Sequence, residues 1–311
     1  MIEDPVADEA PQRTTSRRGA LFGAATVLAG TVAGCGLTKS DNSPAKTTPV
    51  ANKSGDTGSL LDRVKSTKKI RFGVDLSFKP LQYRDPKTKE PTGYSIEVSK
   101  LLATALGATP EWVEVPFQEI ISAQKAGRFD MVGIPVVNTT ERALEVAFAG
   151  APAFLEGTYL FQRPGLGLKQ ISQLNDSSKT IAILAGSAQS QTAKLLFPKA
   201  KLKELPDDVA ATADVTTGRS DALFIGDYSI ADARAKKLEL ITNRPVATAW
   251  NTYFLPQGDA AMQQFVTTFL QNKAADLTLN NLWQKFVAGG IEKYGVQTAP
   301  VKDPYLAAAY A

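Results

Sequence analysis

The chain has 311 residues, of which 43% are hydrophobic, so it is long enough for two domains with cores of their own. It has no histidine and one cysteine, which excludes histidine bases, Ser-His-Asp triads, histidine metal sites, disulfides and thiolate clusters. The net charge is +4 and the charges are dispersed, so no basic tract indicates nucleic-acid binding, and we expect no metal or cofactor.

Residues 1–34 have the layout of a bacterial export signal. Arg17 and Arg18 precede an apolar run at 20–34, which is shorter than the roughly 20 residues that a membrane-spanning helix needs. Residues 32–35, Val-Ala-Gly-Cys, resemble a lipobox, in which Cys35 is lipidated and becomes the new N-terminus. The arginine pair resembles a twin-arginine signal, and the export route, twin-arginine or general, stays open. The alternative is a chance arginine pair and a buried cysteine.

Residues 35–58 are expected to form a flexible tether. They are rich in Ser, Thr, Lys, Asn, Gly and Pro and hold almost no large apolar residue, so they cannot bury enough surface to fold. A flexible chain of this length spans on the order of 25 Å. A lipidated Cys35 followed by such a tether predicts a folded body held beside a membrane.

The body alternates predicted strands with predicted helices. In the helix at 96–106, apolar residues recur at i, i+3, i+4, i+7 and i+8, and Gly107 follows it. We expect strands at 69–74, 112–115, 129–134, 180–184, 201–204 and 222–225, and helices at 96–106, 117–126, 187–196, 208–217, 260–270 and 279–286. Strands separated by helices of this length predict an α/β fold with mostly parallel sheets covered on both faces.

One short motif recurs 91 residues further along the chain. Residues 126–132 place a glycine at a predicted helix end, then a basic residue, then Asp130 directly before a strand. Residues 217–223 repeat this order with Asp221. Such turns are common in α/β proteins, but together with the recurring strand–helix order the motif favours two similar lobes.

Four stretches of the body are informative through their order and spacing in the chain. They are residues 73–81 (Gly-Val-Asp-Leu-Ser-Phe-Lys-Pro-Leu) with 92–97, residues 117–130, residues 139–142 (Thr-Thr-Glu-Arg) with 146–148 and Pro152, and residues 181–189 (Ile-Ala-Ile-Leu-Ala-Gly-Ser-Ala-Gln). In this order and spacing, the chain from 69 to 289 resembles the extracellular solute-binding proteins, family 3, of polar amino acid ABC transporters.

The resemblance implies a two-lobed periplasmic-binding-protein-like fold of type II, with the ligand enclosed in a cleft between the lobes. Lobe 1 would comprise residues 59–160 with 250–290, and lobe 2 residues 161–249. Crossing strands would lie near 158–163 and 247–254, and closure would be a hinge motion. Residues 291–311 form a C-terminal tail to which we assign no function.

The resemblance also implies a ligand site in the cleft. Arg142 aligns with the arginine that holds the ligand α-carboxylate, and its planar guanidinium suits that task. Phe78 aligns with an aromatic residue that packs over the ligand. Ser187, Ala188 and Gln189 start a predicted helix directly after a strand, where free N–H groups and the helix dipole favour an anion.

Two acids complete the expected site. Asp75 lies at the C-terminal end of the first predicted strand, where ligands of open α/β sheets bind. Asp227 is our choice for the acid that pairs with the ligand amino group. Structural roles remain open as alternatives, with Arg142 as a solvated surface arginine, Ser187 and Asp227 as helix caps, and Phe78 as a core residue.

The predicted site departs from the family pattern at three positions. Val137 stands where a Ser or Thr hydroxyl is common, Pro135 replaces another small polar residue, and Ala188 also lacks the usual hydroxyl. Backbone groups remain available at all three. The contacts are thinner than the family's, so an amine-poor organic acid stays an alternative ligand to an ordinary amino acid.

The sequence thus predicts a lipid-anchored, extracytoplasmic receptor that binds a small polar solute, expected to be an amino acid, and delivers it to an ABC permease. We expect a monomer without catalytic activity. One alternative is a cyclohexadienyl (arogenate or prephenate) dehydratase-like enzyme on the same fold, with Asp75 or Asp227 as the general acid. The other is a sensor that uses the lobes without transport. A lipid tether suits delivery to a permease better than turnover of a diffusing metabolite.

Overall fold

A computed structural model of the protein describes residues 58–294. The predicted export signal, the lipidated Cys35 and the tether up to residue 57 lie outside the described residues, as does the tail from 295 onward. None of the helices between residues 58 and 294 combines the length and the hydropathy that a bilayer crossing requires.

The first half of the fold is built on a parallel sheet of three strands in the order β5-β1-β6. Its strands are β1 (Lys69–Val74), β5 (Thr109–Glu114) and β6 (Met131–Val132). Its helical segments are α1 (Leu60–Thr67), α2 (Tyr94–Ala105), the 3-10 turn η1 (Phe117–Glu119) and α3 (Ile120–Lys125). A small antiparallel sheet of β2 (Ser77–Phe78), β3 (Gln82–Arg84) and β4 (Pro91–Thr92) extends this half.

The second half repeats the arrangement. Its parallel strands β10 (Thr180–Leu184), β11 (Lys201–Leu205) and β12 (Ala222–Gly226) stand in the order β11-β10-β12. Its helical segments are η2 (Ile171–Leu174), α5 (Ala188–Leu196), α6 (Asp208–Thr216), η3 (Asp227–Ser229) and α7 (Ile230–Ala235). The α/β fold class expected from the sequence is therefore confirmed.

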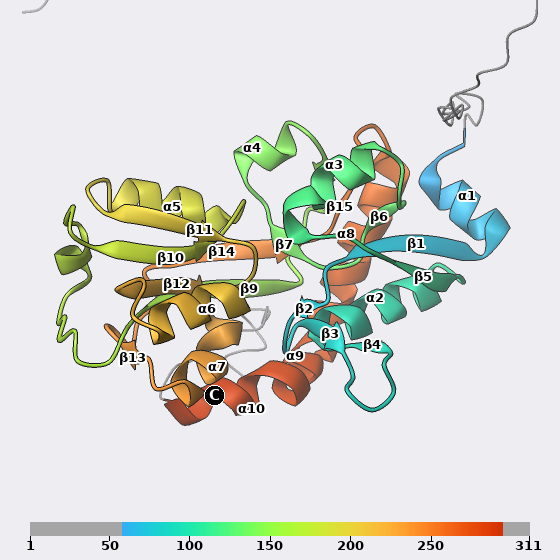
Figure 1. Ribbon diagram of the computed structural model, residues 1–311. Helices are drawn as coiled ribbons and strands as arrows, with labels where there is room; N and C mark the ends of the chain where they lie inside the picture. The colour runs from blue at the N-terminus through green and yellow to red at the C-terminus, as the bar shows by residue number, and fades with distance from the viewer. Residues whose placement is uncertain (1–57, 295–311) are drawn as a thin grey trace, which may run out of the picture. The chain divides into compact units, whose positions relative to one another are not determined.

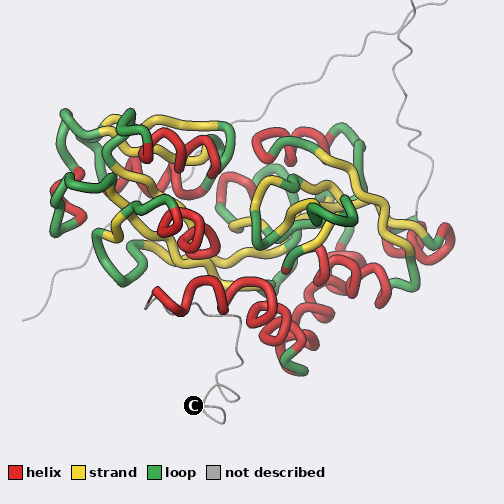
Figure 2. Tube along the Cα trace, turned by 60° about the horizontal axis from the view of Figure 1, so that its bottom comes forward, coloured by secondary structure: helices red, strands yellow, loops and turns green. Residues whose placement is uncertain are grey.

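Two long strands cross between the halves (Figures 1 and 2). Strand β9 (Phe154–Gln162) pairs antiparallel with β12 and with β13 (Glu239–Leu240) in the second half, and with β14 (Ala247–Thr252) along the crossing. Strand β14 also pairs with β7 (Val136–Val137), which follows the first sheet. The crossing strand β14 lies within the expected range 247–254, whereas β9 begins at Phe154, before the expected range 158–163. The predicted lobe boundaries fall inside these two strands and remain a prediction.

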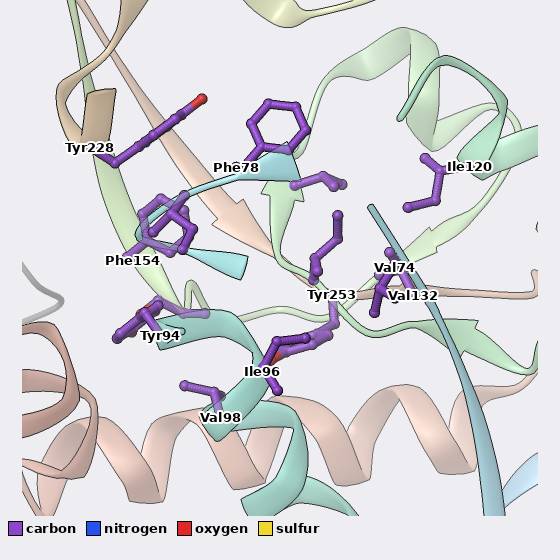
Figure 3. Packing of buried hydrophobic residues seen from close by; sticks show 14 of the residues in the cluster. Val74, Phe78, Tyr94, Ile96, Val98, Ile120, Val132, Phe154, Tyr228 and Tyr253 are labelled. Atoms are coloured by element: carbon purple, nitrogen blue, oxygen red, sulfur yellow. The ribbon is translucent and has the colours of Figure 1, made fainter. Parts of the chain in front are cut away.

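The C-terminal helices begin against the first half and end against α7 of the second half. They are α8 (Ala260–Ala275), α9 (Thr278–Trp283), the π-helical η4 (Gln284–Ala288), α10 (Gly289–Ile291) and the 3-10 turn η5 (Glu292–Tyr294). Helix α8 contacts α1 and α2, and α9 contacts α2. The ring of Tyr94 on α2 packs edge-on against Trp283 and Phe154, at centroid distances of 5.2 and 5.7 Å. Figure 3 shows Tyr94 and Phe154 within the large buried cluster that this packing completes.

Several expected elements differ at their ends. The helix expected at 117–126 begins as the turn η1, and the helix expected at 279–286 changes from α to π-helical hydrogen bonding after Trp283. Helix α8 continues to Ala275, beyond the expected end at 270. The strand expected at 129–134 is reduced to β6, because the chain leaves the sheet toward β7 and α4 (Thr140–Ala143), and β8 (Ala147–Phe148) then pairs with β15 (Phe254–Leu255).

The repeated glycine–basic–acid motif occupies equivalent places in both halves. Gly127 and Gly218 adopt the left-handed conformation, with φ of 71° and 77°. The Asp130 carboxylate accepts a hydrogen bond from the Arg71 N–H of β1 at 2.8 Å, and Asp221 accepts one from the Thr180 N–H of β10 at 3.0 Å. The motif therefore marks a true internal correspondence: each aspartate ties the end of a helix to the first residues of its central strand.

Replacing Asp130 is expected to destabilise the first half. Its carboxylate is buried and also binds the side chains of Arg71 and Arg63, at 2.6 and 2.7 Å. Asp130→Ala leaves the Arg71 N–H without this acceptor and should lower the unfolding free energy by about 2–3 kcal/mol in urea titrations. Glu145→Ala, which removes an exposed pair with Lys125, should stay within about 0.5 kcal/mol of wild type. Equal effects of the two changes would contradict this role.

Candidate functional site

A cavity between the two halves gathers most of the predicted site residues. The cavity is partly open to solvent. Its walls are formed by Phe78, Leu81, Gln82, Phe117, Ile134, Pro135, Val136, Val137, Arg142, Phe154, Glu156, Leu184, Ser187, Ala188, Gln189, Tyr228 and Asn251. Seven of the nine predicted ligand-binding residues are in this set, and Asp75 and Asp227 are not.

Arg142 spans the gap between the halves. Its helix α4 is capped by Thr139, whose hydroxyl accepts from the Arg142 N–H at 3.3 Å. Its guanidinium donates to the Val137 carbonyl at 2.7 Å and to the Gly186 carbonyl at 3.0 Å. It also lies over the Phe117 ring, 5.5 Å from the centroid. The alternative of a solvated surface arginine therefore does not fit.

The guanidinium is half-buried without a carboxylate partner in ion-pair distance among residues 58–294. Burial lowers the pKa of Arg142, and the charges of Glu156 and Glu141 oppose that shift. Its contacts are neutral backbone carbonyls, so its positive charge is available to an anion in the cavity.

The turn after β10 places three predicted residues opposite Arg142. Gly186 has a φ of 68°, which turns the chain from the strand into α5. The Ser187 hydroxyl donates to the Leu184 carbonyl at 2.7 Å and accepts from the Ser190 N–H at 3.2 Å. Ser187 is thus an N-cap, as its structural alternative stated, while it, Ala188 and Gln189 also line the cavity.

Aromatic rings form one wall of the cavity. Phe78 of β2 is buried and packs against Phe117, with ring centroids 5.6 Å apart. Tyr228 of η3 contributes a ring from the second half. Figure 3 shows Phe78 and Tyr228 at one end of the buried cluster. A ligand in the cavity would therefore meet apolar surface on this side.

Pro135 and Val137 form the wall that follows β6. Val137 presents its carbonyl to Arg142 rather than a hydroxyl to the cavity. Pro135, Val137 and Ala188 line the cavity and offer it no polar side-chain group.

Asp75 binds neighbouring loop residues and does not line the cavity. One carboxylate oxygen accepts from the Ser77 N–H at 2.9 Å and from the Ser77 hydroxyl at 2.6 Å. The other accepts from the Phe117 N–H at 2.8 Å. Asp75 thus holds the loop that presents Phe78 and the turn that presents Phe117, and its expected contact with ligand has no support from this geometry.

Asp227 lies behind the cavity wall. It is 2% exposed, and its Oδ2 accepts from the Gly157 N–H at 3.1 Å. Its Oδ1 is buried and has no hydrogen-bond partner among the described residues. The neighbouring Tyr228, not Asp227 itself, reaches the cavity.

Glu156 is the acid that the sequence reading missed. It lies on the crossing strand β9, is 3% exposed and lines the cavity. Its Oε2 accepts from the Asn251 side-chain amide at 3.0 Å, and its Oε1 accepts from the Gln189 side-chain amide. The detectable signal was a glutamate inside an otherwise apolar strand, followed by Gly157. Asn251, Gln82, Phe154 and Tyr228 were missed as well.

The two acids are held where ionisation is unfavourable. Burial, followed by the charge of Asp227, raises the pKa of Glu156 to about 8, while the hydrogen bonds from Asn251 and Gln189 oppose this rise. Burial raises the pKa of Asp227 to about 7, and the hydrogen bond from the Gly157 N–H opposes this rise. The cavity therefore has a cationic side at Arg142 and an acidic side at Glu156, which suits a small molecule that carries both charges.

The family is shown by a direct match. The family described as bacterial extracellular solute-binding proteins, family 3, matches residues 70–289. This chain belongs to that family. Over 233 residues this solute-binding protein is 25% identical to the ABC transporter glutamine-binding protein GlnH of Bacillus subtilis (strain 168), covering 73% of this chain and 84% of GlnH. Over 164 residues it is 26% identical to the arginine-binding extracellular protein ArtP of the same strain, covering 51% of this chain and 62% of ArtP.

Solved structures confirm the expected two-lobed type II fold. The ancestral amino acid-binding protein AncCDT-1, described as a precursor of cyclohexadienyl dehydratase, matches with a TM-score of 0.68 and 26% identity over 74% of this chain and all of AncCDT-1. The L-cysteine solute receptor of Neisseria gonorrhoeae matches with a TM-score of 0.69 over 78% of this chain and 100% of its own, at 19% identity, which speaks for the fold alone. The dehydratase alternative is not favoured, because AncCDT-1 is itself a binding protein.

The buried Glu156 predicts a pH-dependent stability of this solute-binding protein. The pKa of Glu156 is raised in the folded state, so its proton stabilises the folded protein, and this stability is fully present below the ordinary glutamate pKa. It falls as the pH rises above that value and is lost once the pH has passed about 8. Relative to wild type, Glu156→Gln should gain unfolding free energy between pH 5 and 8, on the order of 1 kcal/mol per pH unit.

Urea unfolding of both proteins at each pH measures this difference. The exposed Glu119, changed to glutamine, is the control and should run parallel to wild type. A constant offset between Glu156→Gln and wild type over this range would show that Glu156 ionises freely in the folded protein.

Proposed function

We propose that this protein is an extracytoplasmic receptor that binds an amino acid in the cavity between its lobes and delivers it to an ABC permease. The observation that carries the proposal is the Arg142 guanidinium, which faces the Gly186 turn across the cavity without an acidic partner of its own among the described residues. The names of GlnH and ArtP, which specify binding of glutamine and of arginine, support an amino acid as the solute class.

The ligand carboxylate is proposed to lie between Arg142 and the start of α5. A carboxylate there would meet the guanidinium and the N–H groups of the turn that Ser187 caps. The ligand's remaining atoms would contact the rings of Phe78, Phe117 and Tyr228. The absence of hydroxyls at positions 135, 137 and 188 leaves the carboxylate more dependent on Arg142.

A screen of L-amino acids against the mature protein tests this function, since a ligand that binds only the folded state raises the melting temperature. Prephenate and arogenate belong in the same screen, because consumption of either would revive the enzyme alternative. The proposal fails if no L-amino acid raises the melting temperature at millimolar concentration.

Loss of the guanidinium should abolish most of the affinity. Arg142→Ala is expected to cost about 2–5 kcal/mol of binding free energy, because the buried ligand carboxylate loses its charged partner. Isothermal titration calorimetry with an amino acid found in the screen measures this loss of binding free energy. Arg128→Ala, an exposed arginine in the same lobe, is the matched control and should bind as wild type. Affinity of Arg142→Ala within about threefold of wild type would refute the carboxylate site.

We propose that the mature receptor is a monomer anchored to the outer face of the cell membrane by a lipid on Cys35, with residues 36–58 as its tether. The support is the export-signal layout and the lipobox-like residues 32–35.

The anchor can be tested in cells that express the full chain. Cys35→Ser should move the folded receptor from the membrane fraction to the soluble extracytoplasmic fraction, because the residue that would carry the lipid is removed. Wild type and Ser40→Ala, a change in the tether, are the controls. Tight membrane association of Cys35→Ser would contradict lipidation at this residue.

A further inference from the structure

One hydrogen-bond acceptor at the cavity has no donor among the described residues. Four buried side-chain atoms within residues 58–294 have no hydrogen-bond partner, and they belong to Gln82, Ser95, Asp227 and Asn280. Of these four residues, Gln82 alone lines the cavity. Gln82 is 4% exposed, so water has little access to its Oε1 atom. A buried acceptor without a donor is costly, and at the wall of a binding cavity a ligand is able to supply the missing donor.

The fold directs Gln82 toward the same space as Phe78. Strands β2 and β3 pair antiparallel with Phe78 directly opposite Gln82, so the two side chains share one face of this small sheet, and both line the cavity. The Leu81 carbonyl accepts from the Ser95 N–H of α2 at 2.8 Å. A β-carbon at Gly93 would lie 2.5 Å from the Leu81 oxygen, so this close approach of α2 requires glycine. The backbone that carries Gln82 is therefore held in place by the start of α2.

The other polar side chains of the cavity already have partners. Ser187 caps α5, and the amides of Asn251 and Gln189 donate to Glu156. The charged residues of the cavity wall are Arg142 and Glu156, one of each sign. An amino acid brings one carboxylate and one ammonium group of its own. A further charge on its side chain would find no additional counter-charge among the described residues of the wall, so a neutral, polar side chain suits this cavity better.

We propose that Gln82 recognises a carboxamide on the side chain of the bound amino acid, so that the solute class is glutamine and asparagine. The inference rests on the proposed function and deepens it by naming the ligand side chain. The carboxamide NH2 of the ligand donates to the Gln82 Oε1, and the Gln82 Nε2 donates to the carboxamide oxygen. A carboxylate in the same place only accepts, and an apolar group neither donates nor accepts, so both leave Oε1 without a donor. A cationic side chain donates but brings an unmatched charge.

Calorimetry with matched ligands on the wild-type mature protein tests the inference. L-Glutamine is compared with L-glutamate and L-homoleucine, and L-asparagine with L-aspartate and L-leucine, so that the shape is kept while the carboxamide becomes a carboxylate or an apolar group. For the carboxamide that fits the cavity, we expect an affinity about tenfold or more above that of either analogue. Equal affinities within both sets, or binding of other L-amino acids but of neither carboxamide, overturn the inference and leave the proposed function intact. If no L-amino acid binds, the proposed function itself has failed.

Variants assign the preference to Gln82. Gln82→Met keeps the length and the apolar stem of the side chain but removes the amide. It should bind the carboxamide about tenfold or more weakly and lose the preference over the apolar analogue, whose own affinity should not fall. Tyr83→Phe is the matched control, because this side chain points to the opposite face of β3 and does not line the cavity, and it should bind as wild type. A preference retained in Gln82→Met overturns the inference.

Melting temperatures of the ligand-free proteins separate ligand recognition from a structural role. Gln82→Met removes a buried acceptor that has no donor, so this variant should melt at or above the wild-type temperature. A structural hydrogen bond of Gln82 would instead make the variant melt at a lower temperature. A lower melting temperature together with wild-type ligand affinities therefore overturns the inference. Should Gln82→Met fail to fold, the comparison of matched ligands on the wild-type protein still decides the inference.

Discussion

The antiparallel pairing of β9 with β14 is the constraint on which the site depends. The two strands are in register from Ala247 opposite Thr158 to Asn251 opposite Phe154, and each continues into a different half of the fold. Side chains two apart on a strand point to the same face, so Phe154 and Glu156 both reach the cavity. The neighbouring strand supplies Asn251 on that face, and this amide holds the glutamate. The floor of the cavity is therefore part of the connection between the lobes.

Local patterns predicted much of this fold. The strands at 69–74 and 180–184 have the expected bounds. The second is a short, mostly apolar run, and the first alternates charged and apolar residues over its first four positions. The repeated motif led to two halves, and the structure places Asp130 and Asp221 in equivalent hydrogen bonds. Helix ends were less predictable, since the change to a 3-10 turn at 117–119 depends on Asp75, a residue 42 positions earlier.

The acidic residues of the site could not be assigned from local sequence. Asp75 stands at the end of a central strand, as expected, but its oxygens are occupied by Ser77 and Phe117. Glu156 reads as one charged residue in an apolar strand, and its exposure to the cavity follows from pairing with a strand 95 residues away. Arg142 was identified through the family resemblance, because by itself an arginine after Thr-Thr-Glu has many structural uses. Non-local pairing thus decides which of several plausible acids meets the cavity.

Gly226, at the end of β12, lies directly against two residues of the cavity wall, Glu156 and Tyr228. A β-carbon there would lie 2.7 Å from the Glu156 Oε1 and would overlap the Tyr228 ring. Only hydrogen fits at this point while the carboxyl and the phenol keep their places. A side chain at position 226 would consequently require changes at both 156 and 228. A smaller residue in place of the glutamate would not by itself admit a side chain at 226, because the phenol ring would lie closer still to the added carbon.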